Sequence, residues 1–145
     1  MTHEENERWR PFCSMEYPSE FYKKILDRIQ DGVYFTDKER RIHYWNRGAE
    51  RLTGYSDQEV VGSCCADNLL MHVDTQGTQL CREGCPLSAT MADGMEREAQ
   101  VYLHHKAGQR VPVRVRTMAV RDAQGETVGA IEVFSDNSRT VDLLE

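Results

Sequence analysis

Long apolar runs are missing from this sequence of 145 residues. No stretch approaches the roughly 20 apolar residues that a membrane-spanning helix requires. The first ten residues, MTHEENERWR, are polar and lack the apolar centre of a secretory signal peptide. We therefore expect a cytoplasmic protein that makes no contact with a membrane.

Basic clusters and catalytic motifs are missing as well. The formal net charge is −6, and no dense run of Lys and Arg occurs. Because neutralised phosphates supply most of the affinity for nucleic acids, we expect no direct contact with DNA or RNA. There is no Walker loop, nucleophile elbow or ordered Ser/His/Asp set, so the residues present do not indicate an enzyme.

The chain length suits one domain with short extensions. Residues 1–18 show little periodicity and are expected to form a flexible leader. Residues 19–30 are predicted to form an amphipathic helix that covers its own domain or pairs with a second copy, and we favour a homodimer. The apolar face of this helix consists of Phe21, Tyr22, Ile25, Leu26 and Ile29.

Two strands and two short helices are predicted from local signals after residue 31. Val33–Thr36 and Ile42–Trp45 are β-branched and aromatic runs joined by a charged connection, which is typical of a hairpin. Asn46 is placed to cap a helix that Gly54 ends. A second short helix is expected to start at a capping box, Ser56-Asp57-Gln58-Glu59, and to end at Gly62.

Three further strands are predicted in the second half of the chain. Apolar and polar residues alternate in residues 99–104 and 111–116, which indicates strands with one face on the core. The segment 128–134 is too apolar to be an exposed edge. Short turns between these segments favour antiparallel neighbours.

The segment WNRGAERLTGYSDQEVVG closely resembles the first half of a PAS domain, the sensory module of bacterial signalling proteins. The resemblance implies an α+β fold with a five-stranded antiparallel sheet, short helices on one face and the N-terminal amphipathic helix. It also implies a pocket between sheet and helices for a cofactor, a small ligand or only side chains. On this basis residues 31–136 form the PAS domain, and residues 137–145 begin a linker to an output domain or include a cloning remnant.

A cluster of metal-binding residue types lies in the middle of the chain. Cys65, His72, Cys81 and Cys85 occur within 21 residues, with Cys64 as a substitute for Cys65. Thiolate and imidazole are ligands of zinc, iron and iron–sulfur clusters. Pro86 at the first position of a helix would place Cys85 at the helix start, where the dipole favours the thiolate.

The chemistry of these cysteines has three interpretations, ranked here in order. The first is a metal or iron–sulfur site, the second is buried thiols that only pack, and the third is a thiol redox switch. The segment resembles a Cys-rich PAS subfamily found in diguanylate cyclases and enhancer-binding transcription activators. The matching residues are Gly62 to Cys65, Cys81 to Leu87, and Thr90 to Gly94.

Flavin and haem rank behind zinc and iron as cofactors. Gly62 to Cys65 resembles the adduct-forming segment of flavin-binding LOV domains, but Ala66, Asp67 and Asn68 depart from it. The pair His104-His105 could ligate haem or a metal, although it precedes a hairpin turn, where exposed histidines are common.

We therefore expect a sensory input domain that detects redox state or metal through the Cys/His cluster. A change there would shift the packing of helices on the sheet, and the last strand would pass it on beyond Asp136. The alternative is a small-molecule-binding or dimerisation module with structural cysteines. A catalytic output such as a diguanylate cyclase or kinase would lie in a C-terminal domain outside this chain.

Overall fold

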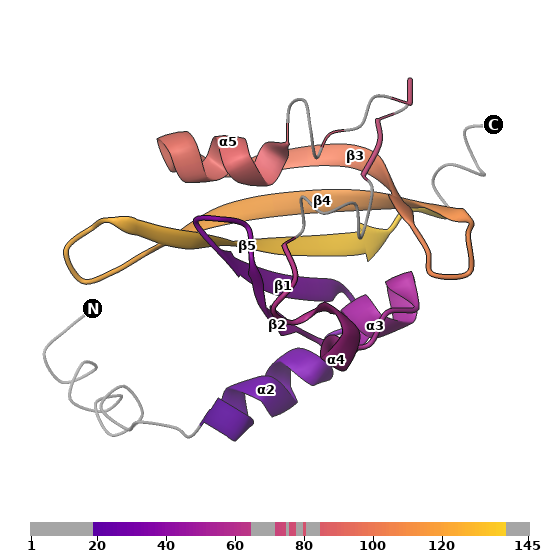
Figure 1. Cartoon of the computed structure of the whole chain (residues 1–145), viewed down its shortest axis with the longest axis horizontal. Coiled ribbons are helices and arrows are strands. Elements are labelled where there is room, and N and C mark those ends of the chain that lie inside the picture. The colour runs from indigo at the N-terminus through magenta and orange to yellow at the C-terminus, as the bar shows by residue number, and fades with distance from the viewer. Residues whose placement is uncertain (1–18, 65–71, 75, 78–79, 81–84, 139–145) are drawn as a thin grey trace, which may run out of the picture.

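A five-stranded antiparallel sheet forms the centre of the molecule (Figure 1). The computed structural model describes residues 19–64, 72–74, 76–77, 80 and 85–138. The strands are β1 (Gly32–Asp37), β2 (Ile42–Trp45), β3 (Arg97–His104), β4 (Arg110–Arg121) and β5 (Thr127–Asp136). Their order in the sheet is β2-β1-β5-β4-β3, with every neighbour antiparallel. The predicted sheet is confirmed, and β5 occupies its centre as its apolar sequence indicated.

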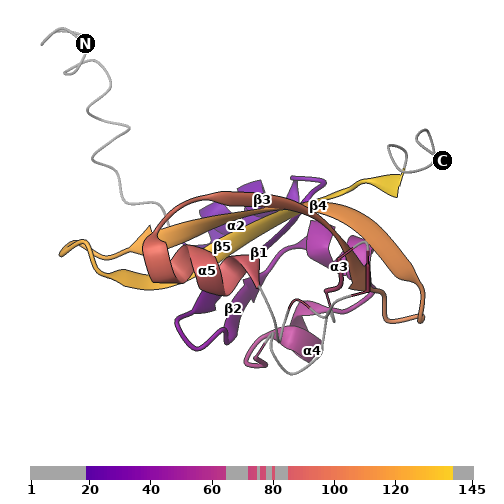
Figure 2. The same ribbon diagram turned by 90° about the horizontal axis from the view of Figure 1, so that it is seen from above.

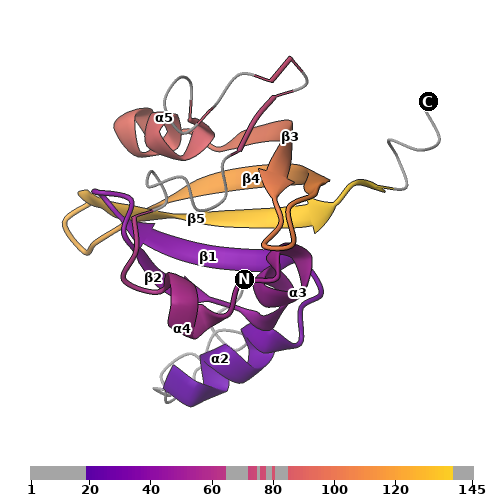
Figure 3. The ribbon, with the colours of Figure 1, turned by 45° about the vertical axis from the view of Figure 1, so that its right-hand side comes forward.

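Short helices surround this sheet. They are α2 (Ser19–Asp27), α3 (Arg47–Thr53), α4 (Asp57–Val60) and α5 (Pro86–Asp93). Helix α3 contacts β1, α4 contacts β2, and α5 contacts β3, β4 and β5, an arrangement seen from above in Figure 2. Figures 1 and 3 show α5 and α2 at opposite ends of the sheet. Among the described helices, none is long and apolar enough to cross a membrane.

Asn46 fixes the junction between β2 and α3. Its Oδ1 accepts hydrogen bonds of 2.8 Å from the backbone N–H groups of Val33 and Ala49. Its Nδ2 donates to the carbonyls of Leu26 at 2.9 Å and Asp31 at 3.1 Å. The predicted N-cap is confirmed, and the same side chain also ties β1 to the end of α2.

The predicted end of α3 and start of α4 are confirmed, but α4 ends at Val60, before the predicted Gly62. Gly54 ends α3 in the left-handed conformation at φ 78°, a region that glycine enters without steric cost. Ser56 and Glu59 form both bonds of the capping box that starts α4. Gly94 ends α5 at φ 74°.

Helix α2 is shorter than the expected range 19–30 and its apolar face is uncovered. It ends at Asp27, where the carbonyl of the preceding Leu26 accepts the bond from Asn46. Phe21 is 41% exposed, and Tyr22 and Ile25 are each 50% exposed. The helix therefore does not bury this face in its own domain. The expected leader 1–18 and residues 139–145 of the expected linker lie outside the described residues.

The apolar core lies between the sheet and helices α3, α4 and α5. Its largest fully buried side chains include Tyr34, Phe134 and Ile42, together with Leu87 of α5 and Leu103 of β3. In β3 and β4, buried residues alternate with more exposed ones, as the period-two pattern predicted. The buried residues of β1, β4 and β5 lie on one face of the sheet, and the candidate site described below lies on the same face.

Both outer strands pair with short segments of chain. At the β2 edge, the Gly62 N–H donates to the Ile42 carbonyl, and the Ile42 N–H donates to the Ser63 carbonyl, both at 2.8 Å. At the β3 edge, Val73 and Tyr102 exchange two backbone hydrogen bonds of 2.9 and 2.8 Å. These contacts place residues 62–64 and 72–74 alongside the sheet.

Candidate functional site

Glu132 is a carboxyl group buried on the core face of the central strand. It is 2% exposed and lies on β5 between Ala130 and Phe134, which are both fully buried. Its neighbours across the sheet are Tyr34 on β1 and Thr117 on β4. A titratable group at this position is unusual, because Glu is rarely buried without a charged or metal partner.

His72 faces this carboxyl group from the segment that pairs with β3. The backbone bonds of Val73 to Tyr102 hold the segment, and the His72 carbonyl accepts a bond of 2.8 Å from the Leu80 N–H. His72 is 8% exposed, and its Nε2 lies 3.8 Å from Glu132 Oε2. Both atoms are buried and neither has a hydrogen-bond partner. His72 and Glu132, with Tyr34 beside them, are called the buried centre below.

Burial determines the protonation of the buried centre. It raises the pKa of Glu132 from 4.5 to about 7, against the smaller opposing effect of a hydrogen bond with the Tyr34 hydroxyl. Burial, with a smaller effect of the Arg110 charge, lowers the pKa of His72 from 6.5 to about 4. Between these values the pair is a carboxylic acid facing a neutral imidazole. The two side chains, 3.8 Å apart, therefore do not form an ion pair in that pH range.

Threonine hydroxyls extend this polar region across the core face. Thr36 lies two residues along β1 from Tyr34, is fully buried, and its Oγ1 has no hydrogen-bond partner. On the other side, the hydroxyls of Thr90 on α5 and Thr117 on β4 share a hydrogen bond of 2.6 Å. The interior thus contains three unpartnered buried side-chain atoms within the described residues: Thr36 Oγ1, His72 Nε2 and Glu132 Oε2.

The predicted Cys/His cluster is only partly visible. Cys65 and Cys81 lie outside the described residues. Cys85 is the N-cap of α5, as the Pro86 signal indicated, and makes no side-chain capping bond. Cys64 lies at the β2 edge, where its thiol donates to the Glu39 carbonyl at 3.2 Å. In the part of the chain that the structure describes, no three His, Cys, Asp or Glu side chains form a metal-binding group.

Two further histidines, one of them from the predicted pair His104-His105, have local partners. His105, in the turn after β3, accepts a bond of 3.0 Å at Nδ1 from the Ala107 N–H. His43 on β2 lies 2.8 Å from Asp37, and this contact lowers the pKa of the Asp37 carboxyl group. These contacts stabilise the two hairpins.

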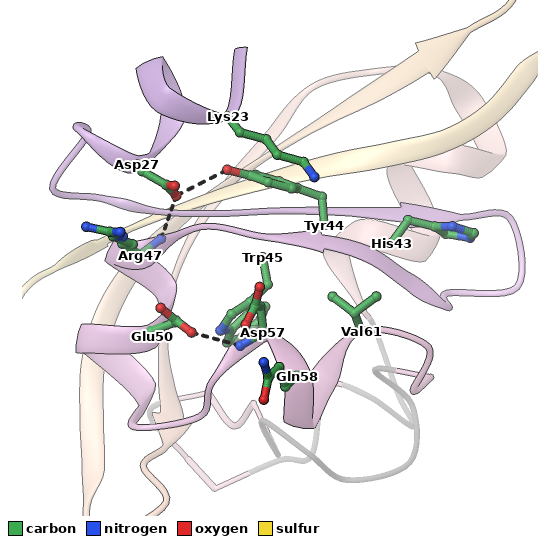
Figure 4. A pocket seen from close by; sticks show the side chains of 10 residues that line it. All are labelled: Lys23, Asp27, His43, Tyr44, Trp45, Arg47, Glu50, Asp57, Gln58 and Val61. Atoms are coloured by element: carbon green, nitrogen blue, oxygen red, sulfur yellow. Dashed lines mark hydrogen bonds between the residues drawn. The ribbon is translucent and has the colours of Figure 1, made fainter. Parts of the chain in front are cut away.

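A groove lies on the surface between α2 and α4. This groove of about 700 Å³ is shown in Figure 4. Asp27 of α2 accepts bonds there from the Tyr44 hydroxyl and the Arg47 N–H, and Glu50 accepts from the Asp57 N–H. Burial and the nearby Asp27 charge raise the pKa of Tyr44 to about 12. These polar groups bond to one another, so the unpartnered buried atoms favour the buried centre as the functional site.

A family model described as PAS fold matches residues 26–142. The chain belongs to the PAS-fold family. It is similar to the signal transduction histidine-protein kinase AtoS of Escherichia coli (strain K12), with 27% identity over 115 residues. The match covers 77% of this chain and 17% of AtoS, so the chain spans about a sixth of that relative's length.

Solved structures share the PAS fold. The PAS domain of a protein from Colwellia psychrerythraea superposes with a TM-score of 0.67 at 21% identity, covering 81% of this chain and 94% of that one. An RNA-binding light-oxygen-voltage receptor gives a TM-score of 0.69 at 19% identity, covering 86% of this chain and 35% of that one. The structure of Vibrio cholerae VqmA gives a TM-score of 0.66 at 13% identity, covering 86% of this chain and 53% of that one. The predicted PAS domain is confirmed.

Glu132 was not predicted from the sequence as a member of the candidate site in this PAS domain. The signal that could have found it is strand parity. Glu132 has the same parity along β5 as Ala130 and Phe134, so a strand that buries Phe134 also turns this carboxyl group inward. His72 was predicted, but its buried contact is with Glu132, a residue 60 positions away.

Proposed function

We propose that this PAS domain is the sensory input of a larger bacterial signalling protein and that the buried centre detects the signal. The observation that supports this proposal is the pair of facing, buried and unpartnered atoms, His72 Nε2 and Glu132 Oε2. Buried polar atoms in folded proteins almost always have partners. An unpartnered pair therefore suggests a bound species or a change in protonation as the signal.

Strand β5 offers a direct route from the buried centre to the output. Glu132 lies four residues before Asp136, and β5 is hydrogen-bonded on both sides, to β1 and β4. Asp136 then accepts a bond of 2.9 Å from the Ser138 N–H, at the end of the described chain. A shift of Glu132 would move a strand that leads to the following segment.

For the nature of the signal, we retain metal or redox state detected through Cys65, His72, Cys81 and Cys85, with Cys64 as a substitute. Two features support this choice. The buried His72 Nε2 has no hydrogen-bond partner, and the Cys85 thiol makes no capping bond at the start of α5. Zinc, iron or an iron–sulfur cluster would suit these ligands, and flavin or haem ranks behind them.

A chimera tests the sensory function. The chain is joined to the kinase region of a histidine kinase, and autophosphorylation is measured with and without chelator or oxidant. We expect Glu132→Gln and His72→Gln to abolish the response. Glu126→Gln, at an exposed turn, and His104→Gln, on the sheet edge, serve as controls of the same residue types. A full response in both buried-centre variants would refute the proposal.

A dimerisation module with structural cysteines is the second candidate, and α2 supports it. Phe21, Tyr22 and Ile25 form an apolar surface with 41 to 50% exposure on this helix. Large exposed apolar surfaces often mark interfaces between proteins. The solved structure of the fungal photoreceptor Vivid is of a light-state dimer. A second copy of α2 is the partner that we propose for this surface.

Sedimentation velocity tests the homodimer. We expect the wild-type chain to sediment as a dimer and the double variant Tyr22→Glu/Ile25→Glu as a monomer. Lys23→Gln/Lys24→Gln lowers the net charge of the same helix by the same amount but leaves its apolar residues in place, so it controls for charge. A wild-type monomer at high micromolar concentration would rule out this interface.

The output and the location also stay predictions. The relative AtoS is a histidine-protein kinase, which supports a kinase output domain after residue 145, and the diguanylate cyclase expected from the sequence is the alternative. The cytoplasmic location and the binding of a small ligand, which the sequence led us to expect, are likewise predictions.

A further inference from the structure

We propose that His72 Nε2 and Glu132 Oε2 are two ligands of one divalent transition-metal ion. The inference rests on the proposed function in that the buried centre is the sensing site. It goes beyond that proposal by assigning a carboxylate ligand from the sheet, outside the cysteine-rich segment. It also predicts metal binding that can be measured without any output domain.

The separation of the two atoms fits a shared ion. At 3.8 Å, Nε2 and Oε2 are too far apart for a direct hydrogen bond. Zinc–nitrogen and zinc–carboxylate bonds are each about 2.0–2.2 Å, so two ligands of a tetrahedral ion lie about 3.4 Å apart, slightly closer than these two atoms. A single ion between them would bond to both with small side-chain movements.

Charge favours a cation at this position. Glu132 is 2% exposed, and its Oε2 has no hydrogen-bond partner. Buried carboxylates in proteins are normally paired or bound to a metal. A divalent ion would supply positive charge at Oε2, and an imidazole nitrogen such as the facing His72 Nε2 is a common metal ligand.

The surrounding contacts already orient both ligands. The Tyr34 hydroxyl bonds to the Glu132 carboxyl group, and the backbone bonds of Val73 and Leu80 fix the position of His72. Supporting contacts of this kind hold ligands at metal sites. One imidazole and one carboxylate suit zinc or ferrous iron.

Metal titration of the full chain tests the inference. The chain is purified anaerobically, stripped with chelator and titrated with Zn²⁺ and with Co²⁺, whose absorption reports its ligands. We expect one ion per chain and at least about 100-fold weaker binding in Glu132→Gln and His72→Gln. Glu126→Gln and His104→Gln should bind as the wild type does. Tyr34→Phe should weaken binding by about 10-fold, because it removes only an orienting bond.

A second measurement avoids the variants. In the wild type, the ring resonances of His72 should shift in step with zinc and saturate at one equivalent. An unchanged His72 resonance, a wild type without stoichiometric metal, or wild-type affinity in Glu132→Gln would each overturn the inference.

Two further results separate the metal site from the proposed function. Metal lost in Cys81→Ser/Cys85→Ser but retained in Glu132→Gln would overturn the ligand assignment and leave the Cys/His sensing centre standing. Metal lost in Glu132→Gln with no effect on the chimera's kinase response would support the metal site and refute its sensory role.

Discussion

Replacing Glu132 with Gln should change the pH dependence of the free energy of unfolding. In the metal-free protein, burial raises the pKa of Glu132 from 4.5 to about 7. Between these pH values the folded state keeps a proton that the unfolded state has released. The stabilising contribution of Glu132 is therefore fully present below pH 4.5 and is lost as the pH rises through 7.

The magnitude follows from this change in pKa. Since one unit of pKa corresponds to about 1.4 kcal/mol, the rise from 4.5 to about 7 amounts to about 3 kcal/mol. Glu132→Gln has no titrating proton at this position. Its free energy of unfolding relative to the wild type should increase by about 3 kcal/mol between pH 4.5 and 8.

His72 has the opposite effect. Its pKa is lowered from 6.5 to about 4, so its stabilising contribution is present above pH 6.5 and is lost as the pH falls to 4. Between pH 4.5 and 6.5 the effects of the two residues oppose each other, and the pair should give the wild type a nearly flat pH profile there. Glu132→Gln should instead lose stability steadily on acidification.

Urea unfolding followed by circular dichroism measures these profiles. The wild type, Glu132→Gln and the control Glu126→Gln are compared from pH 4.5 to 8 in the presence of chelator. Taking differences between proteins removes the contributions of exposed carboxyl groups such as Asp93. A constant difference between Glu132→Gln and the wild type across this pH range would refute the assignment of a buried, uncompensated carboxyl group.

Three further predictions concern the scaffold, each measured by urea unfolding. Asn46→Asp should lower the free energy of unfolding by about 3 kcal/mol, because it replaces the amide group that donates to two carbonyls with an oxygen. An unchanged free energy of unfolding would contradict the role of the four Asn46 hydrogen bonds. Gly32→Ala should cost about 1–3 kcal/mol, because its Cβ would lie 2.2 Å from the Phe134 ring; an unchanged urea midpoint would contradict this packing. Thr90→Val and Thr117→Val should each cost about 1–3 kcal/mol, and the double variant less than their sum, because their hydroxyls bond to each other; strict additivity would contradict the bond.

The fold was predictable because its signals are local. The cap at Asn46, the αL residue at Gly54 and the capping box at Ser56 each depend on residues within one or two turns. Alternation within single strands likewise indicated the core faces of β3 and β4. These local signals predicted the order of the elements along the chain, and the resemblance to the PAS family predicted how the strands form one sheet.

The candidate site was harder to predict because its contacts are distant in sequence. Spacing predicted that His72 joins nearby cysteines, of which Cys65 and Cys81 lie outside the described residues, and it gave no sign that the imidazole also faces Glu132. That approach depends on the pairing of Val73 with β3, which no local pattern indicates. Similarly, α2 ends at Asp27 because Asn46, nearly twenty residues later, takes the Leu26 carbonyl.

The short segments beside β2 and β3 have a consequence for self-association. An open sheet edge presents free N–H and C=O groups on which a neighbouring chain can add a strand. Residues 62–64 and Val73 occupy part of each edge of this sheet. Continuous growth of the sheet from molecule to molecule is thereby hindered, and concentrated protein should resist cross-β aggregation as long as these two segments stay docked.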